Sequence, residues 1–176
     1  NCMLRGAHVT LVNASVSVEP PMFVDVVNVT SAADMADVVK SKAAEQDIII
    51  MTAAVADFCP SHPADEKIKK NDSSYEAVIE LERTEDILSY LGAHKAKGQL
   101  ICGFSMETQN MLENSKAKLA KKNADMIVAN NLKVAGAGFG TDTNVVTLIT
   151  ADDCTELEIM DKSCVAARIM DRLLQM

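Results

Sequence analysis

Lysines with the spacing to hold an anion occur at two places in the chain. Lys67, Lys69 and Lys70 form the cluster KIKK, and Lys118 and Lys122 stand four residues apart in a segment with a helical pattern. Two ammonium groups at that spacing project from one side of a helix and repel each other by about 0.2–0.5 kcal/mol unless an anion lies between them. A phosphorylated ligand held by these lysines is one interpretation, and a solvated surface is the other.

Further residues that could do chemistry follow apolar segments with the length of strands. Asp57 comes directly after the uncharged run 48–56, and Phe104 and Asn130 end two later segments of the same kind. In open α/β sheets, ligands bind outside the carboxyl ends of the strands. Asp57 could therefore contact a ribose hydroxyl or a metal ion held by phosphates. The alternative, that it caps a helix or is an ordinary loop acid, stays open.

The overall charge limits the partners that these lysines could serve. The chain has a net charge of −8 and a pI near 4.8, so its long-range field repels nucleic acids and anionic membranes. We expect neither as a partner, and a phosphate ligand must be held by a local cluster of lysines. The five cysteines have no C-x-x-C spacing, which predicts neither a zinc site nor a disulfide framework but reduced thiols in the cytoplasm.

Short apolar strands alternate with helix-length segments, which predicts one α/β domain, residues 1–176, with a mostly parallel sheet flanked by helices. The expected strands are 8–12, 24–29, 47–52, 99–104, 125–130 and 144–150. The expected helices are 31–44, 85–91, 108–122 and 162–174. Ser31 is the expected N-cap of the first helix, with Asp34 at its third position, and Gly6 is expected to end what looks like the last turn of a helix that begins upstream. The strand at 47–52 is apolar on every side, as a central strand covered on both faces should be.

One segment departs from this alternation. Residues 66–82, EKIKKNDSSYEAVIELE, are interpreted as two strands around the turn NDSS, within a flap of about 60–82. One side of the second strand is apolar and includes Tyr75, Ala77 and Ile79. This apolar side could be buried against the domain itself or against a second copy of the protein, and the sequence does not decide between these alternatives.

Five motifs, AAVADF, EKIKK, GFSMET, KLAKKNADMIVANN and GAGFGTDTNVVTLI, occur in an order that resembles phosphopantothenoylcysteine synthetase. This synthetase is the second activity of the bifunctional bacterial coenzyme A biosynthesis protein, beside a phosphopantothenoylcysteine decarboxylase that holds FMN. The resemblance implies a Rossmann-like fold, a homodimer joined through the flap hairpin, and the use of CTP and Mg²⁺. The implied reaction activates 4′-phosphopantothenate as an acyl-cytidylate with release of pyrophosphate, and cysteine then displaces CMP to give phosphopantothenoylcysteine.

The resemblance also implies which residues form the site. Lys67 matches a lysine that serves acyl activation and transfer from a mobile flap, so it is the expected catalytic residue. Phe104 matches an aromatic residue beside the cytosine, and Lys118 and Lys122 match two lysines at the phosphates. The segment 85–88 matches one usually read PDI, with glutamate in place of proline. The expected nucleotide-binding residues are Met51, Thr52, Ala53, Asp57, Lys67, Glu85, Asp86, Ile87, Leu88, Phe104, Lys118 and Lys122, with no metal ligand set of the protein's own.

Relatives in this family carry a first strand, a glycine-rich loop and an N-x-S-S-G segment before the stretch that matches RGAHVTLV, and these are not among the 176 residues. We therefore expect a gap in the sheet and interpret the chain as a fragment, or the product of an incomplete gene, without full activity. Two alternatives stay open. One is a non-catalytic or truncated paralogue that acts as a dimerisation or regulatory module, and the other is an ATP-using ligase of the same fold.

Overall fold

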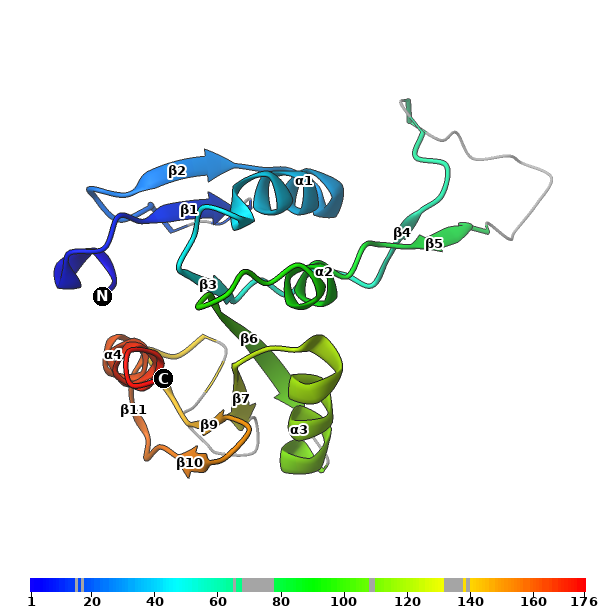
Figure 1. The fold of residues 1–176 in the computed structure, drawn as a ribbon. Helices are drawn as coiled ribbons and strands as arrows, with labels where there is room; N and C mark the ends of the chain where they lie inside the picture. The colour runs from blue at the N-terminus through cyan, green and yellow to red at the C-terminus, as the bar shows by residue number, and fades with distance from the viewer. Residues whose placement is uncertain are drawn as a thin grey trace.

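A computed structural model describes residues 1–14, 16, 18–64, 66–67, 78–107, 110–131, 138 and 140–176. Its main sheet has the strand order β10–β9–β7–β6–β3 (Figure 1). These strands are β3 (Ile48–Met51), β6 (Leu100–Glu107), β7 (Met126–Asn131), β9 (Val146–Ile149) and β10 (Cys154–Glu156). β3, β6 and β7 run parallel, whereas β9 is antiparallel to β7 and β10 is antiparallel to β9. The expected mostly parallel α/β sheet is confirmed.

The helices fall where the sequence pattern predicts them. In the described residues they are α1 (Ala32–Ala43), α2 (Ile87–Ala93), α3 (Met111–Lys122), α4 (Lys162–Leu173) and the short 3-10 helix η1 (Met3–Arg5). The Ser31 hydroxyl accepts a hydrogen bond from the Asp34 amide, and the Asp34 carboxylate accepts one from the Ser31 amide at 2.9 Å. This reciprocal pair satisfies two amides that have no partner inside the helix. Gly6 ends η1 with a φ of 85°, a conformation that favours glycine.

The core consists of two apolar clusters that share the sheet between them. On one side Cys102, Met126 and Val128 of the sheet pack against α4 through residues such as Ile169. On the other side Ile101 packs with buried residues of α1 and α2. Adjacent residues of β6 therefore serve opposite clusters, because side chains alternate across a strand. None of the helices in the described segments is long and apolar enough to cross a membrane.

The expected gap is present. β1 (Thr10–Asn13) and β2 (Asp25–Asn28) form a separate parallel pair, and no ladder joins β1 to β3 among the described residues. A cavity of about 160 Å³ lies between them, lined by β1, β3 and the inner side of α1. The expectation that 47–52 forms a central, covered strand is wrong for β3, which is an edge strand with half-buried residues. Its free edge faces this cavity.

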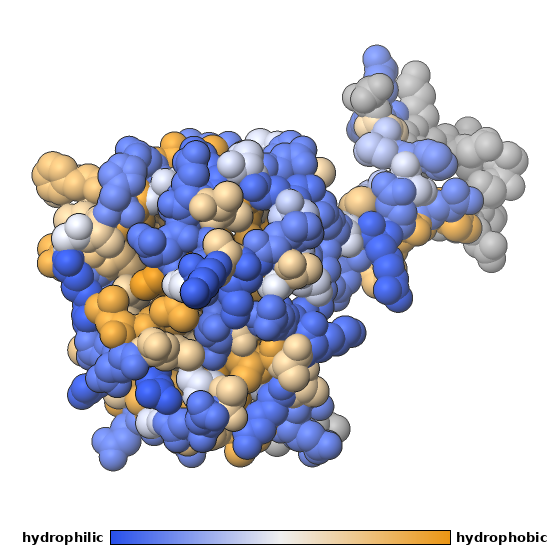
Figure 2. Space-filling model, in the orientation of Figure 1, coloured by the Kyte–Doolittle hydropathy of each residue, from blue (hydrophilic) through white to orange (hydrophobic). Residues whose placement is uncertain are grey.

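The described part of the flap is an antiparallel arm that stands away from the body. β4 (Phe58–Pro60) pairs with β5 (Leu81–Arg83), and Figures 1 and 2 show the arm projecting at one side. The expected strands around NDSS fall largely on 68–77, which lie outside the described residues, so their position stays a prediction. Of the described part, Lys67 and 78–80 lie outside any strand, and Leu81 and Glu82 belong to β5. Apolar side chains are exposed on this arm, with 51% for Phe58 and 59% for Leu81.

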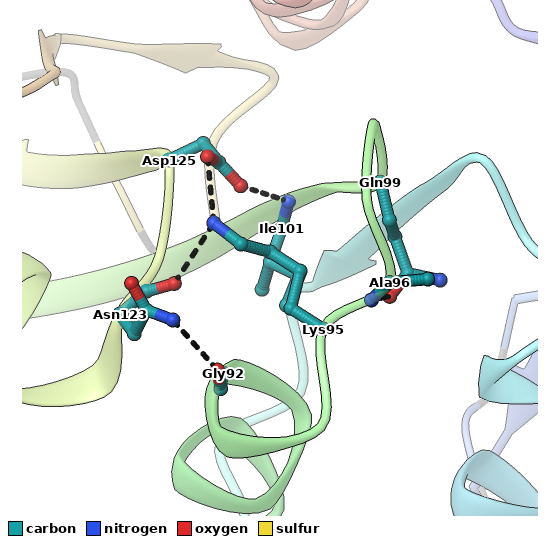
Figure 3. A network of polar contacts seen from close by, with 7 residues as sticks. All are labelled: Gly92, Lys95, Ala96, Gln99, Ile101, Asn123 and Asp125. Carbon is teal, nitrogen blue, oxygen red and sulfur yellow. Dashed lines mark hydrogen bonds and ion pairs between the residues drawn. The ribbon is translucent and has the colours of Figure 1, made fainter.

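A polar network joins α2, α3 and the amino ends of β6 and β7 (Figure 3). Asp125 accepts a hydrogen bond from the Ile101 amide at 2.7 Å and forms an ion pair with Lys95 at 2.9 Å. Lys95 also donates to the Asn123 carbonyl, and the Asn123 side chain donates to the Gly92 carbonyl at 2.7 Å. These contacts lie at the opposite ends of the strands from Asp57 and Phe104, so we assign them to the fold. They set α2 against the end of α3.

Candidate functional site

The structure brings together most of the residues that the sequence predicts for a site. A cavity of about 200 Å³ lies at the carboxyl ends of β3 and β6, where ligands bind in open α/β sheets. Its lining residues are Met51, Ala53, Val55, Ala56, Asp57, Thr84, Glu85, Asp86, Ile87, Leu88, Phe104, Lys118 and Lys122. Residues more than 60 positions apart in the chain, such as Asp57 and Lys122, therefore face one space.

Two of the expected site residues do not line this cavity. Thr52 lines the other cavity, between β1 and β3, to which Met51 and Ala53 also contribute. Lys67 is exposed in the segment between β4 and β5. Lys69 and Lys70 lie outside the described residues. A catalytic role of Lys67 thus stays a prediction that would require the arm to approach the cavity.

The two lysines of α3 are held by different acceptors. The Lys118 ammonium donates to the carbonyl oxygen of Phe104 at 2.9 Å. The Lys122 ammonium forms an ion pair with the Asp86 carboxylate and donates to the Ser89 hydroxyl at 2.9 Å. The Lys122 side chain is only 13% exposed. Since an ammonium has three N–H donors, each lysine keeps donor capacity for a ligand.

A buried pair of hydroxyl groups fixes α3 on β6 beside these lysines. The Ser105 and Ser115 side chains are hydrogen-bonded at 2.8 Å, and both residues are buried. Ser115, Lys118 and Lys122 recur at helical spacing, so they share one side of α3. The serine pair and the contact of Lys118 with Phe104 together set which turn of α3 faces the cavity.

Asp86 begins α2 and is held ionised beside Lys122. Its carboxylate accepts a hydrogen bond from the Ser89 amide at 2.9 Å, as an N-cap residue does. Burial raises the pKa of Asp86, but the Lys122 ammonium and the Ser89 amide outweigh it and hold the pKa below its ordinary value. Its neighbour Glu85 pairs instead with Lys40 of α1 at 2.6 Å. Ser89 is not among the predicted site residues, because its hydroxyl meets Lys122 only through the packing of α2 against α3.

Asp57 stands at the base of the arm. Its carbonyl accepts a hydrogen bond from the Thr84 amide at 3.1 Å, and the Thr84 hydroxyl donates to the Ala56 carbonyl. In the part of the chain that the structure describes, no protein group pairs with the Asp57 carboxylate, and no three His, Cys, Asp or Glu side chains form a metal cluster. Asp57 therefore suits a hydroxyl group or a cation that arrives with the ligand. Thr84 carried no sequence signal, because it reaches the cavity through the pairing of β4 with β5.

Comparisons with known proteins extend over the whole chain. Residues 1–176 match the family model described as DNA/pantothenate metabolism flavoprotein C-terminal domain. The coenzyme A biosynthesis bifunctional protein CoaBC of Bacillus subtilis (strain 168) is 45% identical over 170 residues, which cover 96% of this chain and 41% of that protein. A cysteine/cysteine sulfinic acid decarboxylase from an unknown prokaryotic organism is 44% identical over 171 residues, 96% of this chain and 47% of that protein. The chain thus spans less than half the length of either relative.

A solved structure agrees with these sequence relatives. The crystal structure of the C-terminal domain of coenzyme A biosynthesis bifunctional protein CoaBC has a TM-score of 0.80 and 40% sequence identity. The match covers 99% of this chain and 78% of that one. Sequence and fold therefore agree along the chain, which belongs to the DNA/pantothenate metabolism flavoprotein C-terminal domain family.

Proposed function

We propose that this protein acts in coenzyme A biosynthesis as a phosphopantothenate–cysteine ligase that uses CTP. The observation that carries the proposal is the single cavity lined by Asp57, Phe104, Lys118 and Lys122 at the carboxyl ends of β3 and β6. It brings together Phe104, two cations and a free carboxylate, and these groups suit the base, the phosphates and the ribose of a nucleotide. The relative from B. subtilis, named for coenzyme A biosynthesis, supports the pathway.

Each part of the nucleotide has a partner in this cavity. We assign the base to Phe104, whose half-buried side chain also packs against the core cluster of Cys102, and the phosphates to the ammonium groups of Lys118 and Lys122. Asp57 would hold a ribose hydroxyl or the Mg²⁺ ion that accompanies the nucleotide. When bound, Mg²⁺ neutralises charge on the phosphate oxygens. Ammonium groups already held in place stabilise the charge of a phosphoryl transition state without a further cost of reorganisation.

The proposed reaction has two displacements. A carboxylate oxygen of 4′-phosphopantothenate attacks the α-phosphorus of CTP, the bond to the bridging oxygen breaks, and pyrophosphate leaves with the bonding electrons. The amine of cysteine then attacks the acyl carbon, loses a proton, and CMP leaves. No protein nucleophile is needed. Lys67, brought by the arm, would close over the acyl-cytidylate and limit its hydrolysis by excluding water.

The proposal includes an assembly. We treat residues 1–176 as one domain that forms a homodimer through the arm, whose apolar side chains Phe58, Ile79 and Leu81 are exposed. A partner copy would remove them from water. FMN belongs only to a fused or partner phosphopantothenoylcysteine decarboxylase. The cysteines of the chain are all free thiols, which suits a cytoplasmic protein.

The test is pyrophosphate release by the full-length protein supplied with CTP, Mg²⁺, 4′-phosphopantothenate and cysteine. Lys122→Met should lower kcat/KM for CTP by roughly a hundredfold, because it removes an ammonium from the phosphates. Lys121→Met is the matched control, since Lys121 is exposed on the same helix and does not line the cavity.

Three results would contradict the proposal. The first is no pyrophosphate release, which a non-catalytic paralogue would give. The second is turnover with ATP at the expense of CTP, which would favour the ATP-using ligase of the same fold. The third is an equal loss of activity in Lys121→Met and Lys122→Met, which would show that the cavity is not where the phosphates bind.

A further inference from the structure

Asp86 lines the cavity, yet its carboxylate is occupied within the protein. One oxygen accepts the hydrogen bond from the Ser89 amide, and the other meets the Lys122 ammonium. We propose that Asp86 is a positioning residue, which together with the Ser89 hydroxyl fixes the place where the Lys122 ammonium meets the phosphates of the nucleotide. This inference rests on the proposed function. It gives Asp86 a different role from the nucleotide contact that the family resemblance implies.

The contacts of Lys122 show why it needs such a partner. A lysine side chain is flexible and loses much conformational freedom when it is held in one place. Here two acceptors from one turn of α2 hold its ammonium, the Asp86 carboxylate and the Ser89 hydroxyl at 2.9 Å. One N–H donor then remains for a ligand, in a position that α2 determines.

The contact between α2 and α3 makes that position precise. A Cβ atom on Gly92 would lie 1.7 Å from the carbonyl oxygen of Lys122, so the two helix backbones touch at the residue that bears the ammonium. The Asn123 side chain donates to the Gly92 carbonyl at 2.7 Å. Asp86, Ser89 and Gly92 recur every three residues, so one side of α2 meets the end of α3. Movement of α2 would move the ammonium.

Lys118 provides an internal contrast. Its ammonium is held by a neutral acceptor, the Phe104 carbonyl of the sheet, whereas the acceptor of Lys122 carries a full negative charge. Loss of the Asp86 charge would leave the cavity more positive, so the binding of a polyphosphate should not weaken. The rate should fall, because a transition state is stabilised by charge that is already in place. Positioning therefore predicts that kcat and KM respond differently.

The experiment is a double-mutant cycle on the full-length protein, in which the rate of pyrophosphate release is measured for each variant. Asp86→Asn keeps the size and the N-cap acceptor but removes the charge. We expect its kcat to fall roughly tenfold with no rise in KM for CTP, as a misplaced catalytic group predicts. Lys122→Met should lower kcat and raise KM. Asp86→Asn combined with Lys122→Met should then be no slower than Lys122→Met alone, because Asp86 acts only through Lys122.

Ser89→Ala should reproduce a smaller fall in kcat, since it removes the second acceptor of the same ammonium. Asp153→Asn is the matched control. It neutralises a carboxylate that pairs with Arg172 of α4, does not line the cavity and is not part of α2. Its kcat and KM should stay those of the wild type. The melting temperature of each variant separates a loss of turnover from a loss of fold.

The outcomes distinguish this inference from the proposed function. If the wild type turns over and the effects of Asp86→Asn and Lys122→Met multiply, Asp86 does not act through Lys122 and the inference is wrong. A higher KM with unchanged kcat in Asp86→Asn would also overturn it, since that result indicates direct contact with the nucleotide. Absence of turnover in the wild type with both CTP and ATP would overturn the proposed function, and the inference with it.

Discussion

Gly92 tests whether the contact between α2 and α3 is as close as the structure has it. The substitution Gly92→Ala lies inside a helix, where alanine is normally more stable than glycine by about 1 kcal/mol. Helix propensity alone therefore predicts a gain. The structure predicts the opposite sign.

The loss follows from the atoms that a new Cβ would meet. It would lie 1.7 Å from the carbonyl oxygen of Lys122 and 2.8 Å from the carbonyl carbon, and both atoms belong to the backbone. Neither can rotate away, so α3 must move. Overpacking of this kind costs about 1–3 kcal/mol or more. The hydrogen bond from Asn123 to the Gly92 carbonyl would be strained as well, at about 1 kcal/mol. We expect a net loss of about 3 kcal/mol in the free energy of unfolding.

Urea unfolding at neutral pH measures this loss, and Gly103→Ala is the comparator. A Cβ on Gly103 would meet the side-chain ends of Leu88 at 2.7 Å and Ile127 at 3.0 Å, which can shift. Gly103→Ala should therefore lose only about 1 kcal/mol. If Gly92→Ala is as stable as the wild type, or loses no more than Gly103→Ala, the helices do not touch as described.

Three further predictions concern single groups. Ser31→Ala removes the N-cap of α1 and should lower the free energy of unfolding by about 1 kcal/mol in urea, whereas no change would argue against the cap. The depressed pKa of Asp86 adds stability above its ordinary value of 3.8 that is lost as the pH falls through the folded value, so the advantage of wild type over Asp86→Asn should shrink with acid. A constant difference would contradict this linkage. Burial raises the pKa of the Cys102 thiol to about 12, with Asp125 adding to the shift, so iodoacetamide should label the exposed Cys154 and Cys164 in the native protein and spare Cys102. Mass spectrometry reads the labelled sites, and early labelling of Cys102 would refute its burial.

The helices and the longer strands could be predicted because their signals are local. The start of α1 is encoded by Ser31 and Asp34, which satisfy the first amides of the helix whatever the rest of the chain does. The apolar segments that became β6 and β7 are long enough to show that they are buried. For each of these elements, the residues of the element itself are enough to predict it.

The shorter strands could not be predicted, because they are recognised only by the hydrogen bonds to a partner strand. β4, β10 and β11 (Met160–Asp161) have two or three residues each, too few for an alternating pattern to be seen. β11 pairs with β8 (Thr143–Asn144), which is equally short. In the arm, the observed pairing joins Phe58 to Arg83, and Phe58 belongs to no strand that the sequence predicts. Register depends on the partner strand as well as on alternation.

For the candidate site, the sequence predicted the edge of the sheet but not the contacts there. The rule that ligands bind at carboxyl ends selected Asp57 and Phe104, which do line one cavity. The pairing of Lys122 with Asp86 could not be foreseen, because it depends on how closely α2 approaches α3. That approach depends on the absence of a side chain at Gly92, which a sequence pattern does not distinguish from any other glycine in a helix.

Most of the charged groups around the cavity are already paired within the protein. Glu85 is neutralised by Lys40, and Asp86 by Lys122, so these acids are already paired within the protein. Among the described residues that line the cavity, the charges not offset by an oppositely charged protein group are the Lys118 ammonium, whose acceptor is neutral, and the Asp57 carboxylate, while Lys122 keeps one N–H donor for a ligand. One such cation cannot balance a triphosphate, and the net charge of −8 adds no attraction. The charge balance therefore favours a nucleotide that arrives with its own divalent cation, for which Asp57 is the available carboxylate.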